Sequence, residues 1–353
     1  MTASGPEQEY VSSSLANVQA IGTAKVEVLN SPEEIRRACG LPPAEKDGSV
    51  GTGSTGYVNW SSGWVDAEGA MRWFRTELEK LDRVKFITAT VSRLLIDHTT
   101  DTVSGVIIKD STSTLTSTLT ADLTILAAGA WTPSLLDLRG ICKSTGQPLV
   151  YISLSAQDQT AFRQNPSVLN LTSGLFIISP SDRVLKIARH GHGYTNPTTI
   201  PHPEKEDKES ITVSLPYTHV DDPLQEVPHE AKRSLRDFLA QLYPSLRHSR
   251  FVRQRICWYT DTRSGDFLIS YHPRYKGLFV ATGGSGHAFK FLPVIGDSIV
   301  ECVLGNTPED FRGKWEWPAE RVPEELWEGD GSRGGPVGVV LNKEMAETYS
   351  SNL

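Results

Sequence analysis

The sequence has no long hydrophobic run and few cysteines, and its first residues do not show the pattern of a secretory leader. No apolar stretch approaches the roughly 18 residues that a membrane-spanning helix needs, so we expect no membrane partner. The first residues show no basic segment followed by an apolar core, so we expect no secretion. The four cysteines, Cys39, Cys142, Cys257 and Cys302, are scattered without the short spacings of metal sites or redox motifs. These absences favour an intracellular protein with reduced thiols.

An excess of basic residues is also missing. The chain has 35 Lys and Arg against 42 Asp and Glu, a formal net charge of −7 and a sequence pI of about 5.8. This balance argues against nucleic acid or an anionic membrane as a general partner. With 353 residues the chain is long enough to bury a large core, and we expect two domains.

A nucleotide-binding motif in its proper context is missing too. Residues 51–56 fit the pattern G-x-G-x-x-G letter for letter. However, the sequence of residues 45–48 before them does not predict a strand, and that of residues 57–60 after them does not predict the start of a helix. We therefore interpret residues 44–56 as a surface loop rather than a phosphate-binding turn.

What the sequence does contain is a strand–turn–helix pattern over residues 277–306. Residues 277–282 predict a short apolar strand, and Ile295, Ile299 and Val303 recur at helical spacing up to the stop signal Gly305-Asn306. The glycine-rich turn between them would present backbone N–H groups and the positive end of a helix dipole to an anionic or polarised ligand. Close packing of the helix on the strand is the alternative explanation of such a turn.

Other segments predict elements around this pattern. N-cap residues and apolar faces at helical spacing predict helices at residues 32–39, 67–81 and 229–243. Apolar, β-branched runs predict strands at residues 84–96, 103–109, 123–128, 175–178 and 184–188. Residues 1–23 are polar and patternless, so we expect a mobile N-terminus. The tail over residues 311–353 is expected to wrap over the surface and to lose order at residues 329–335.

Several motifs occur in a fixed order before and within the glycine turn. Residues 257–262 read Cys-Trp-Tyr-Thr-Asp-Thr, residues 271–273 read Tyr-His-Pro, and residues 286–291 read Gly-His-Ala-Phe-Lys-Phe. Together they resemble the C-terminal part of the sarcosine oxidase-like flavoenzymes, which include N-methyl amino acid, pipecolate, saccharopine and fructosyl amino acid oxidases. The resemblance implies a covalent bond from Cys257 to the 8α-methyl group of FAD and places Lys290 over the flavin. The separation of 33 residues between Cys257 and Lys290 is the one that the resemblance implies.

The resemblance also implies roles for further residues. Lys186 would activate oxygen, while His190, Tyr259 and Lys290 would hold the substrate. Fixed cations attract the carboxylate of the substrate and favour the reduction of oxygen. His190 and Tyr259 match the histidine and tyrosine of sarcosine-type members. Fructosyl-type members have glutamate at the position of His190 and tend to have aspartate at the position of Tyr259. The implied cofactor-binding residues are Cys257, Gly129, Trp131, Gly284, Ser285, Gly286, His287, Phe289 and Lys290.

Each of these residues also has a purely structural explanation. Lys186 can extend its ammonium group from apolar neighbours to solvent, and Cys257 can be an inert buried thiol. Lys290 can be a surface lysine, although a cation near a helix start is unfavourable without an anionic partner. The strand that runs into Gly129 can be a packed sheet edge. We expect His287 to shape the turn rather than to act as a base.

The resemblance covers about residues 24–310 and lacks the family's first βαβ unit, whose G-x-G-x-x-G turn binds the FAD pyrophosphate. We therefore expect a mixed α/β fold with an FAD-binding, two-dinucleotide-type domain that is truncated at its N-terminus. This domain would comprise residues 24–146 and 251–310, with an inserted antiparallel-sheet substrate domain over residues 147–250. An arginine that helps to bind the substrate carboxylate would lie in the absent part.

The resulting hypothesis is a monomeric, FAD-dependent amine oxidase. It would oxidise the C–N bond of a secondary amino acid to an imine, with O2 as acceptor and H2O2 as product. A fructosyl amino acid oxidase is the alternative within this class, and a non-catalytic remnant that does not bind FAD is the alternative outside it. The C-terminal tripeptide Ser351-Asn352-Leu353 resembles the peroxisomal signal Ser-Lys-Leu, so we expect a peroxisomal or cytoplasmic protein.

Overall fold

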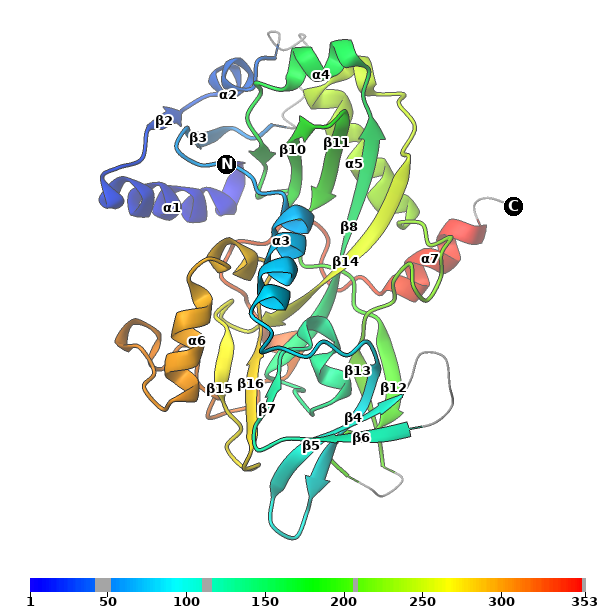
Figure 1. Cartoon of the computed structure of the whole chain (residues 1–353). Helices are drawn as coiled ribbons and strands as arrows, with labels where there is room; N and C mark the ends of the chain where they lie inside the picture. Colours follow the sequence, from blue (N-terminus) through cyan, green and yellow to red (C-terminus); the bar gives the residue numbers. More distant parts are fainter. Residues whose placement is uncertain (42–51, 110–115, 206–208, 351–353) are drawn as a thin grey trace.

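The computed structural model describes residues 1–41, 52–109, 116–205 and 209–350, and Figure 1 shows their arrangement. Within these ranges the chain forms a mixed α/β fold with five sheets and seven α-helices. None of the helices in the described ranges is both long and apolar enough to cross a membrane.

The largest sheet has five antiparallel strands. Their order is β14 (Arg253–Thr262), β8 (Cys142–Ser153), β11 (Val184–Arg189), β10 (Leu175–Ser181) and β9 (Val168–Leu169). Helix α5 (His229–Leu242) covers one face, because its apolar residues recur at helical spacing and lie buried against the sheet in one core. The predicted strands at residues 175–178 and 184–188 are confirmed and pair with each other, and the predicted helix at residues 229–243 is confirmed.

A smaller sheet contains the parallel pair that the glycine turn follows. Strand β16 (Leu278–Thr282) pairs in parallel with β7 (Thr124–Leu126) and antiparallel with β15 (Leu268–Tyr271). Helix α6 (Ile295–Val303) begins after the turn and packs on this sheet through Ile295, Ile299 and Cys302. The predicted strand–turn–helix order is confirmed. Strand β7 forms one edge of the sheet, and its Ile125 is 48% exposed, so this predicted strand is less buried than expected.

The remaining elements are short. Two further antiparallel sheets combine the strands β4 (Thr90–Asp97), β5 (Thr102–Lys109) and β6 (Thr116–Thr120), and the strands β12 (Pro197–Pro201) and β13 (Ser210–Ser214). The predicted strand at residues 84–96 is therefore confirmed only from Thr90 onward. Helix α2 (Pro32–Ala38) begins as predicted at Ser31, whose hydroxyl accepts the N–H of Glu34 at 3.2 Å.

The N-terminal segment is more regular than the sequence suggested. Residues 1–23, expected to be patternless, form β1 (Thr2–Ala3) and α1 (Gln8–Ile21). Few apolar residues occur there, but Tyr10, Val11 and Leu15 lie at helical spacing and pack with Tyr57 and Leu171. A small number of well-placed apolar side chains is enough to dock the helix, and the expectation of an irregular segment is wrong.

The G-x-G-x-x-G segment serves strand packing. Gly51 lies outside the described residues, and Thr55 and Gly56 begin β3 (Thr55–Asn59), which pairs with β1 and with β2 (Val26–Leu29). A Cβ atom at Gly56 would lie 2.3 Å from the carbonyl oxygen of Met1. The glycine is thus required for close strand approach, and no helix follows it. The predicted loop therefore ends before Thr55, because the strand begins there.

Helix α3 (Ala67–Lys80) forms as predicted but leaves its apolar face in solvent. The carboxylate of Asp66 caps it by accepting the N–H of Gly69 at 3.0 Å. Met71 and Leu81 on its apolar face are 50% and 60% exposed. In Figure 1 this helix stands in front of the junction between the two main sheets.

The expected division into domains stays a prediction. The boundary between residues 146 and 147 falls inside β8, which continues through both parts. Leu29, Ile35 and Cys39, expected in the FAD-binding domain, lie in the core of the five-stranded sheet. Helix α7 (Leu341–Ser350) joins the same core through Leu341 and Met345, and Ser351-Asn352-Leu353 lies outside the described residues.

Candidate active site

Two glycine turns lie side by side at the carboxyl ends of the parallel strands β7 and β16. Gly129, with φ of 52°, follows β7 and begins the short helix η2 (Gly129–Ser134), and Gly283, with φ of 72°, follows β16. The hydroxyl groups of Thr132 and Thr282 lie 3.1 Å apart and join the two turns. Ligands of open α/β sheets bind at this edge, where the backbone turns away from parallel strands.

The glycine turn that follows β16 packs against β14. A Cβ atom at Gly286, which has φ of 71°, would lie 2.6 Å from the ring of Tyr259, so only glycine fits there. The N–H of Ser285 donates to the carbonyl of Thr260 at 2.9 Å. His287 donates from Nδ1 to the carbonyl of Ser285 at 2.9 Å, since a carbonyl oxygen only accepts. The imidazole of His287 thus closes the turn.

Alternate residues of β14 point toward the same side of the strand. Cys257, Tyr259 and Asp261 share this side because side chains alternate along a strand. Cys257 is the one exposed cysteine in the described part of the chain. Burial by the surrounding protein raises the pKa of its thiol, and the ammonium group of Lys186 on β11 counteracts this rise.

His190 directly follows β11 and reaches Tyr259. Its Nδ1 atom lies 3.3 Å from the hydroxyl of Tyr259 and 3.1 Å from the guanidinium of Arg333. A guanidinium only donates, so Nδ1 accepts and the proton of the neutral ring resides on Nε2. Burial, and next the charge of Arg333, lowers the pKa of His190 to about 3. Burial raises the pKa of Tyr259 to about 12, so the phenol keeps its proton.

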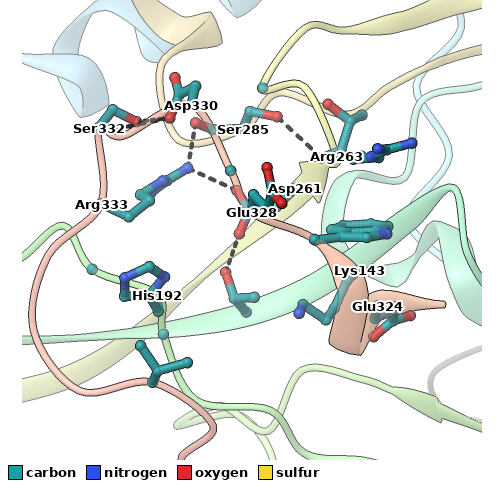
Figure 2. A pocket seen from close by; sticks show the side chains of 18 of the residues that line it. Lys143, His192, Asp261, Arg263, Ser285, Glu324, Glu328, Asp330, Ser332 and Arg333 are labelled. Carbon is teal, nitrogen blue, oxygen red and sulfur yellow. Dashed lines mark hydrogen bonds and ion pairs between the residues drawn. The ribbon is translucent and has the colours of Figure 1, made fainter. Parts of the chain in front are cut away.

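Arg333 comes from the C-terminal tail and binds the centre of the site. Its guanidinium donates to a carboxylate oxygen of Asp261 at 2.8 Å and to the carbonyl of Ser285 at 2.7 Å. It also lies 5.0 Å from the centre of the Tyr259 ring, within the range of a cation–π contact. Figure 2 shows Arg333 beside Asp261 and Ser285. The tail was expected to lose order at residues 329–335, and this expectation is wrong because Arg333 ties it to β14 and to the glycine turn.

A buried polar network supports Asp261 and the turn after His190. The hydroxyl of Thr145 on β8 donates to Asp261 at 2.5 Å, and burial raises the pKa of Asp261 although Arg333 opposes this. Gln147, also on β8, accepts the N–H of Gly191 at 3.0 Å and donates to its carbonyl at 3.2 Å. The network fixes the position of the neighbouring His190.

The structure groups the sequence-predicted residues in part. His190, Tyr259 and the turn from Gly284 to His287 lie in direct contact with one another or through Arg333. Lys290 lies in the short helix η4 (Ala288–Phe291), and its charge lowers the pKa values of His190 and His287. Lys186 lies on β11 close to Cys257. In the described ranges no carboxylate lies within 4.0 Å of either ammonium group.

These residues fit an FAD ring system. Cys257 is an exposed residue of β14, and in the described ranges neither the Lys186 nor the Lys290 ammonium group has a carboxylate within 4.0 Å. Trp131 and Phe289 border the turns with exposed rings, and Trp131 is 50% exposed. An anionic, flat, aromatic group would find cations, a nucleophile and apolar surface there.

A cavity of about 430 Å³ lies beside Arg333, which is one of its lining residues. It shares Asp261, Ser285 and His287 with the site. Tail residues between Glu324 and Gly338 also line it, and Figure 2 labels Glu324, Glu328 and Asp330 among the lining residues. Its lining does not include Cys257.

Sequence analysis missed Asp261, Arg333, Thr145 and Gln147. Asp261 carried a usable signal, because it follows Cys257 and Tyr259 at the period of a strand. Arg333 carried none, since it lies in a glycine-rich tail. The structure adds the guanidinium of Arg333 to the site, and the arginine expected in the absent part stays a prediction.

Residues 1–302 match the sequence model of the FAD dependent oxidoreductase family, DAO. The chain belongs to this family. Among the relatives of this DAO-family chain are amino acid oxidase imqH of Aspergillus flavus, 32% identical over 337 residues, and L-saccharopine oxidase of Schizosaccharomyces pombe, 26% identical over 311 residues. The alignments cover 86% and 87% of this chain, and 69% and 70% of the relatives. Amino acid oxidase fsqB of Aspergillus fumigatus is 30% identical over 81% of this chain, and the chain spans 66% of that relative's length.

Solved structures give the same family fold. A fructosyl peptide oxidase from E. terrenum superposes with a TM-score of 0.79 at 26% identity, over 96% of this chain and 75% of the other. The resemblance to the sarcosine oxidase-like flavoenzymes is thereby confirmed at the family level, and the DAO-family chain is of the amino acid oxidase type. FAD is the cofactor of this family.

Proposed function

We propose that this chain is a flavin-dependent amine oxidase that converts a secondary amino acid to an imine. The observation that carries the proposal is the cationic cluster around a neutral His190. The Arg333 guanidinium and the Lys290 ammonium both lower the pKa of His190, so both positive charges act on its imidazole ring. A site of this charge attracts the carboxylate of an amino acid and orients its nitrogen.

Neither His190 nor Tyr259 acts as a base in this arrangement. Nδ1 of His190 is occupied by Arg333, and Tyr259 holds its proton. Both are therefore donors or shape-determining groups, and the amine must arrive in its neutral form. Lys290 and Arg333 bind the substrate carboxylate, and Lys186 supplies the cation that favours oxygen reduction.

The reaction removes one hydride from the carbon beside nitrogen and one proton from the nitrogen, which leaves a C=N bond. FAD, if bound there, would supply the acceptor for the hydride, and O2 would take up the two electrons with two protons in total to become H2O2. We propose that Cys257 holds the cofactor by a thioether to its 8α-methyl group. Forming that bond removes one hydrogen from the thiol and one from the methyl group, and O2 accepts both as H2O2.

A fructosyl amino acid is the second candidate substrate. The fructosyl peptide oxidase structures favour it, since they match over 96% of this chain. His190 and Tyr259 favour a small N-alkyl amino acid through the resemblance described above. Oxygen uptake with sarcosine, pipecolate, saccharopine and fructosyl-valine separates the two, and activity on fructosyl-valine alone would overturn the preferred choice.

The tether gives the most direct test. The chain, produced with FAD and precipitated with acid, should retain yellow colour in the pellet, and Cys257→Ser should release it to the supernatant. Cys302→Ser is the matched control, because Cys302 is buried on α6 away from β14. A yellow supernatant from the unaltered chain would contradict the tether, and a colourless protein would favour a non-catalytic remnant.

A further inference from the structure

The side of β14 that carries Cys257 also carries two arginines. Side chains alternate along a strand, so Arg253, Arg255 and Cys257 share one side, with roughly 7 Å between successive members. Arg255 is the nearer of the two arginines, two residues from the cysteine. Cys257 is exposed, Arg255 is half-buried, and β14 is an edge strand of its sheet, so both side chains reach the open surface of this strand.

The guanidinium of Arg255 is held in place without a carboxylate. It donates to the backbone carbonyl of Gln254 at 2.8 Å. In the described ranges no carboxylate oxygen lies within 4.0 Å of this guanidinium, whereas Arg189 and Arg333 each have such a partner. A guanidinium does not lose its proton in proteins, so Arg255 keeps an uncompensated positive charge on the side of the thiol.

A second cation, Lys186, lies on the same face of the sheet. Tyr151 of β8 lies opposite Arg253 of β14 and also opposite Lys186 of β11. Residues that lie opposite each other in a sheet point to the same face, so Lys186 shares the face of Cys257. The guanidinium of Arg253 instead stacks on Tyr151, 3.9 Å from the centre of the ring. The thiol is therefore flanked by cations from two strands.

The charges that act on the thiol are both positive. Burial raises the pKa of the Cys257 thiol, and Lys186 and then Arg255 oppose this rise. Tyr259, the next residue on the same side of the strand, has a pKa of about 12 and stays neutral. Because the thiolate and not the thiol is the nucleophile, a neighbouring cation increases the reactive fraction of Cys257.

We propose that Arg255 promotes the bond between Cys257 and the flavin by stabilising the thiolate. The inference rests on the proposed function, which assigns the tether but no group that activates the thiol. In this step the thiol loses its proton, and the sulfur replaces one hydrogen of the 8α-methyl group. The two electrons and two protons that are released go to O2, which becomes H2O2. Arg255 acts through Cys257 and is a positioning residue, whereas Lys186 is also the cation for the reduction of oxygen.

The rate of tether formation tests this role. Chain isolated without flavin is mixed with FAD in air and precipitated with acid at intervals, and the yellow colour of the pellet is followed. At pH 7 we expect Arg255→Met to form the tether about three- to tenfold more slowly, because one nearby charge changes the thiolate fraction by a factor on this order. Arg253→Met is the matched control and should match the unaltered chain. Equal rates for Arg255→Met and the unaltered chain would overturn the inference and leave the tether in place.

The pH profile separates an effect of charge from a loss of structure. In Arg255→Met the pH of half-maximal rate should rise, and at high pH, where the thiol is ionised in both proteins, the rates should converge. Arg255→Lys keeps the charge and should restore most of the rate at pH 7. A rate that stays low at every pH, or that stays low in Arg255→Lys, would indicate a structural role and contradict the inference.

Alkylation of the thiol distinguishes a failure of this inference from a failure of the proposed function. Iodoacetamide reacts with the thiolate, and Cys257→Ser gives the background of the other three cysteines, which are buried. If the chain does not bind FAD, slower alkylation in Arg255→Met than in Arg253→Met at pH 7 still supports the effect of Arg255, while the proposed function fails. Equal alkylation rates overturn the inference whether or not the tether forms.

Discussion

At the residue scale the charge of the site depends on the protonation state of His190. Arg333 donates to Nδ1 of His190, so this histidine is neutral and its Nε2–H is the donor. The same guanidinium neutralises Asp261, whose carboxylate is buried and would otherwise be costly. Burial and this guanidinium together keep His190 neutral, and under the proposed function the same guanidinium binds the substrate carboxylate.

Replacing Arg333 should have two measurable effects. In Arg333→Met we expect KM for an amino acid substrate to rise by about 10- to 100-fold, the loss of one or two charge-assisted hydrogen bonds. The pKa of His190, followed by NMR, should also rise, because the nearby positive charge is gone. Arg312→Met, at an exposed position, is the control. An unchanged pKa of His190 would contradict the contact.

His190 should also make stability depend on pH. Its pKa is about 3 in the folded chain against an ordinary value of 6.5, so between these values the unfolded chain binds a proton that the folded chain does not. The free energy of unfolding therefore falls as pH drops below about 6.5, by about 2 kcal/mol at pH 5 relative to pH 7.

Urea unfolding at several pH values measures this effect. Arg333, Lys290 and His287 face His190 and oppose its protonation, while Asp330 favours it, and His272 adds an independent loss of the same sign. The difference between the unaltered chain and His190→Gln isolates the contribution of His190. If the free energy of unfolding changed with pH in the same way for the two proteins, His190 would not be held neutral in the folded chain.

Residues of the candidate site could be predicted from the sequence only where they lie close together along the chain in a regular pattern. Cys257 and Tyr259 are two positions apart on one strand, and the strand period places them together. Arg333 lies 143 positions from His190 along the chain, and only the folded tail brings them within 3.1 Å. Contacts between distant segments depend on packing that a single sequence does not reveal.

At the element scale the C-terminal tail is held where Gly334 fits into a narrow notch of the backbone. Gly334 lies against the turn at residues 171–174, and a Cβ atom there would be 1.9 Å from the carbonyl oxygen of Leu171 and 2.7 Å from that of Thr172. It also forms a bridge with Gly191, the residue after His190. The notch therefore sets the position from which Arg333 reaches the site.

Gly334→Ala should displace this part of the tail. The clash is with backbone atoms, which cannot rotate away, so we expect the free energy of unfolding to fall by about 1–3 kcal/mol and KM to rise. Gly296→Ala is the matched control, since a Cβ atom at Gly296 on α6 meets nothing within 4 Å. Limited proteolysis should cleave the tail faster in Gly334→Ala only, and equal rates would contradict the role of the notch.

Helices were predicted more reliably than the tail for a physical reason. The apolar residues of α5 recur at helical spacing and all bury against one sheet, so a local pattern specifies the contact. The tail has no such period, because glycine and charged residues specify its path through steric fit and ion pairs.

At the scale of the whole molecule the chain leaves apolar surface open on one side. Helix α3 has no buried residue, and Met71, Trp73 and Leu81 are 50%, 58% and 60% exposed. Strand β7 is a sheet edge, and such edges pair with further strands. The amphipathic pattern of residues 67–81 predicted the helix correctly, but no other element in the described ranges buries its apolar face.

This surface should bind an apolar dye. The double variant Met71→Gln, Leu81→Gln should lower the fluorescence of bound anilinonaphthalene sulfonate while changing the free energy of unfolding by less than about 0.5 kcal/mol. Leu235→Ala on the buried face of α5 should instead lower that free energy by about 2–5 kcal/mol. A loss of stability in the double variant comparable to that of Leu235→Ala would show that α3 is buried in solution.

The route of the tail determines when the pocket is completed during translation. Strands β8, β11 and β14 and the glycine turn all precede Arg333 in the chain, so they leave the ribosome while the guanidinium is still unmade or inside the exit tunnel. A nascent chain therefore carries Asp261 without its cation until Arg333 has left the exit tunnel. Ribosomes stalled shortly after residue 310 would display a folded sheet that has not yet acquired its anion-binding centre.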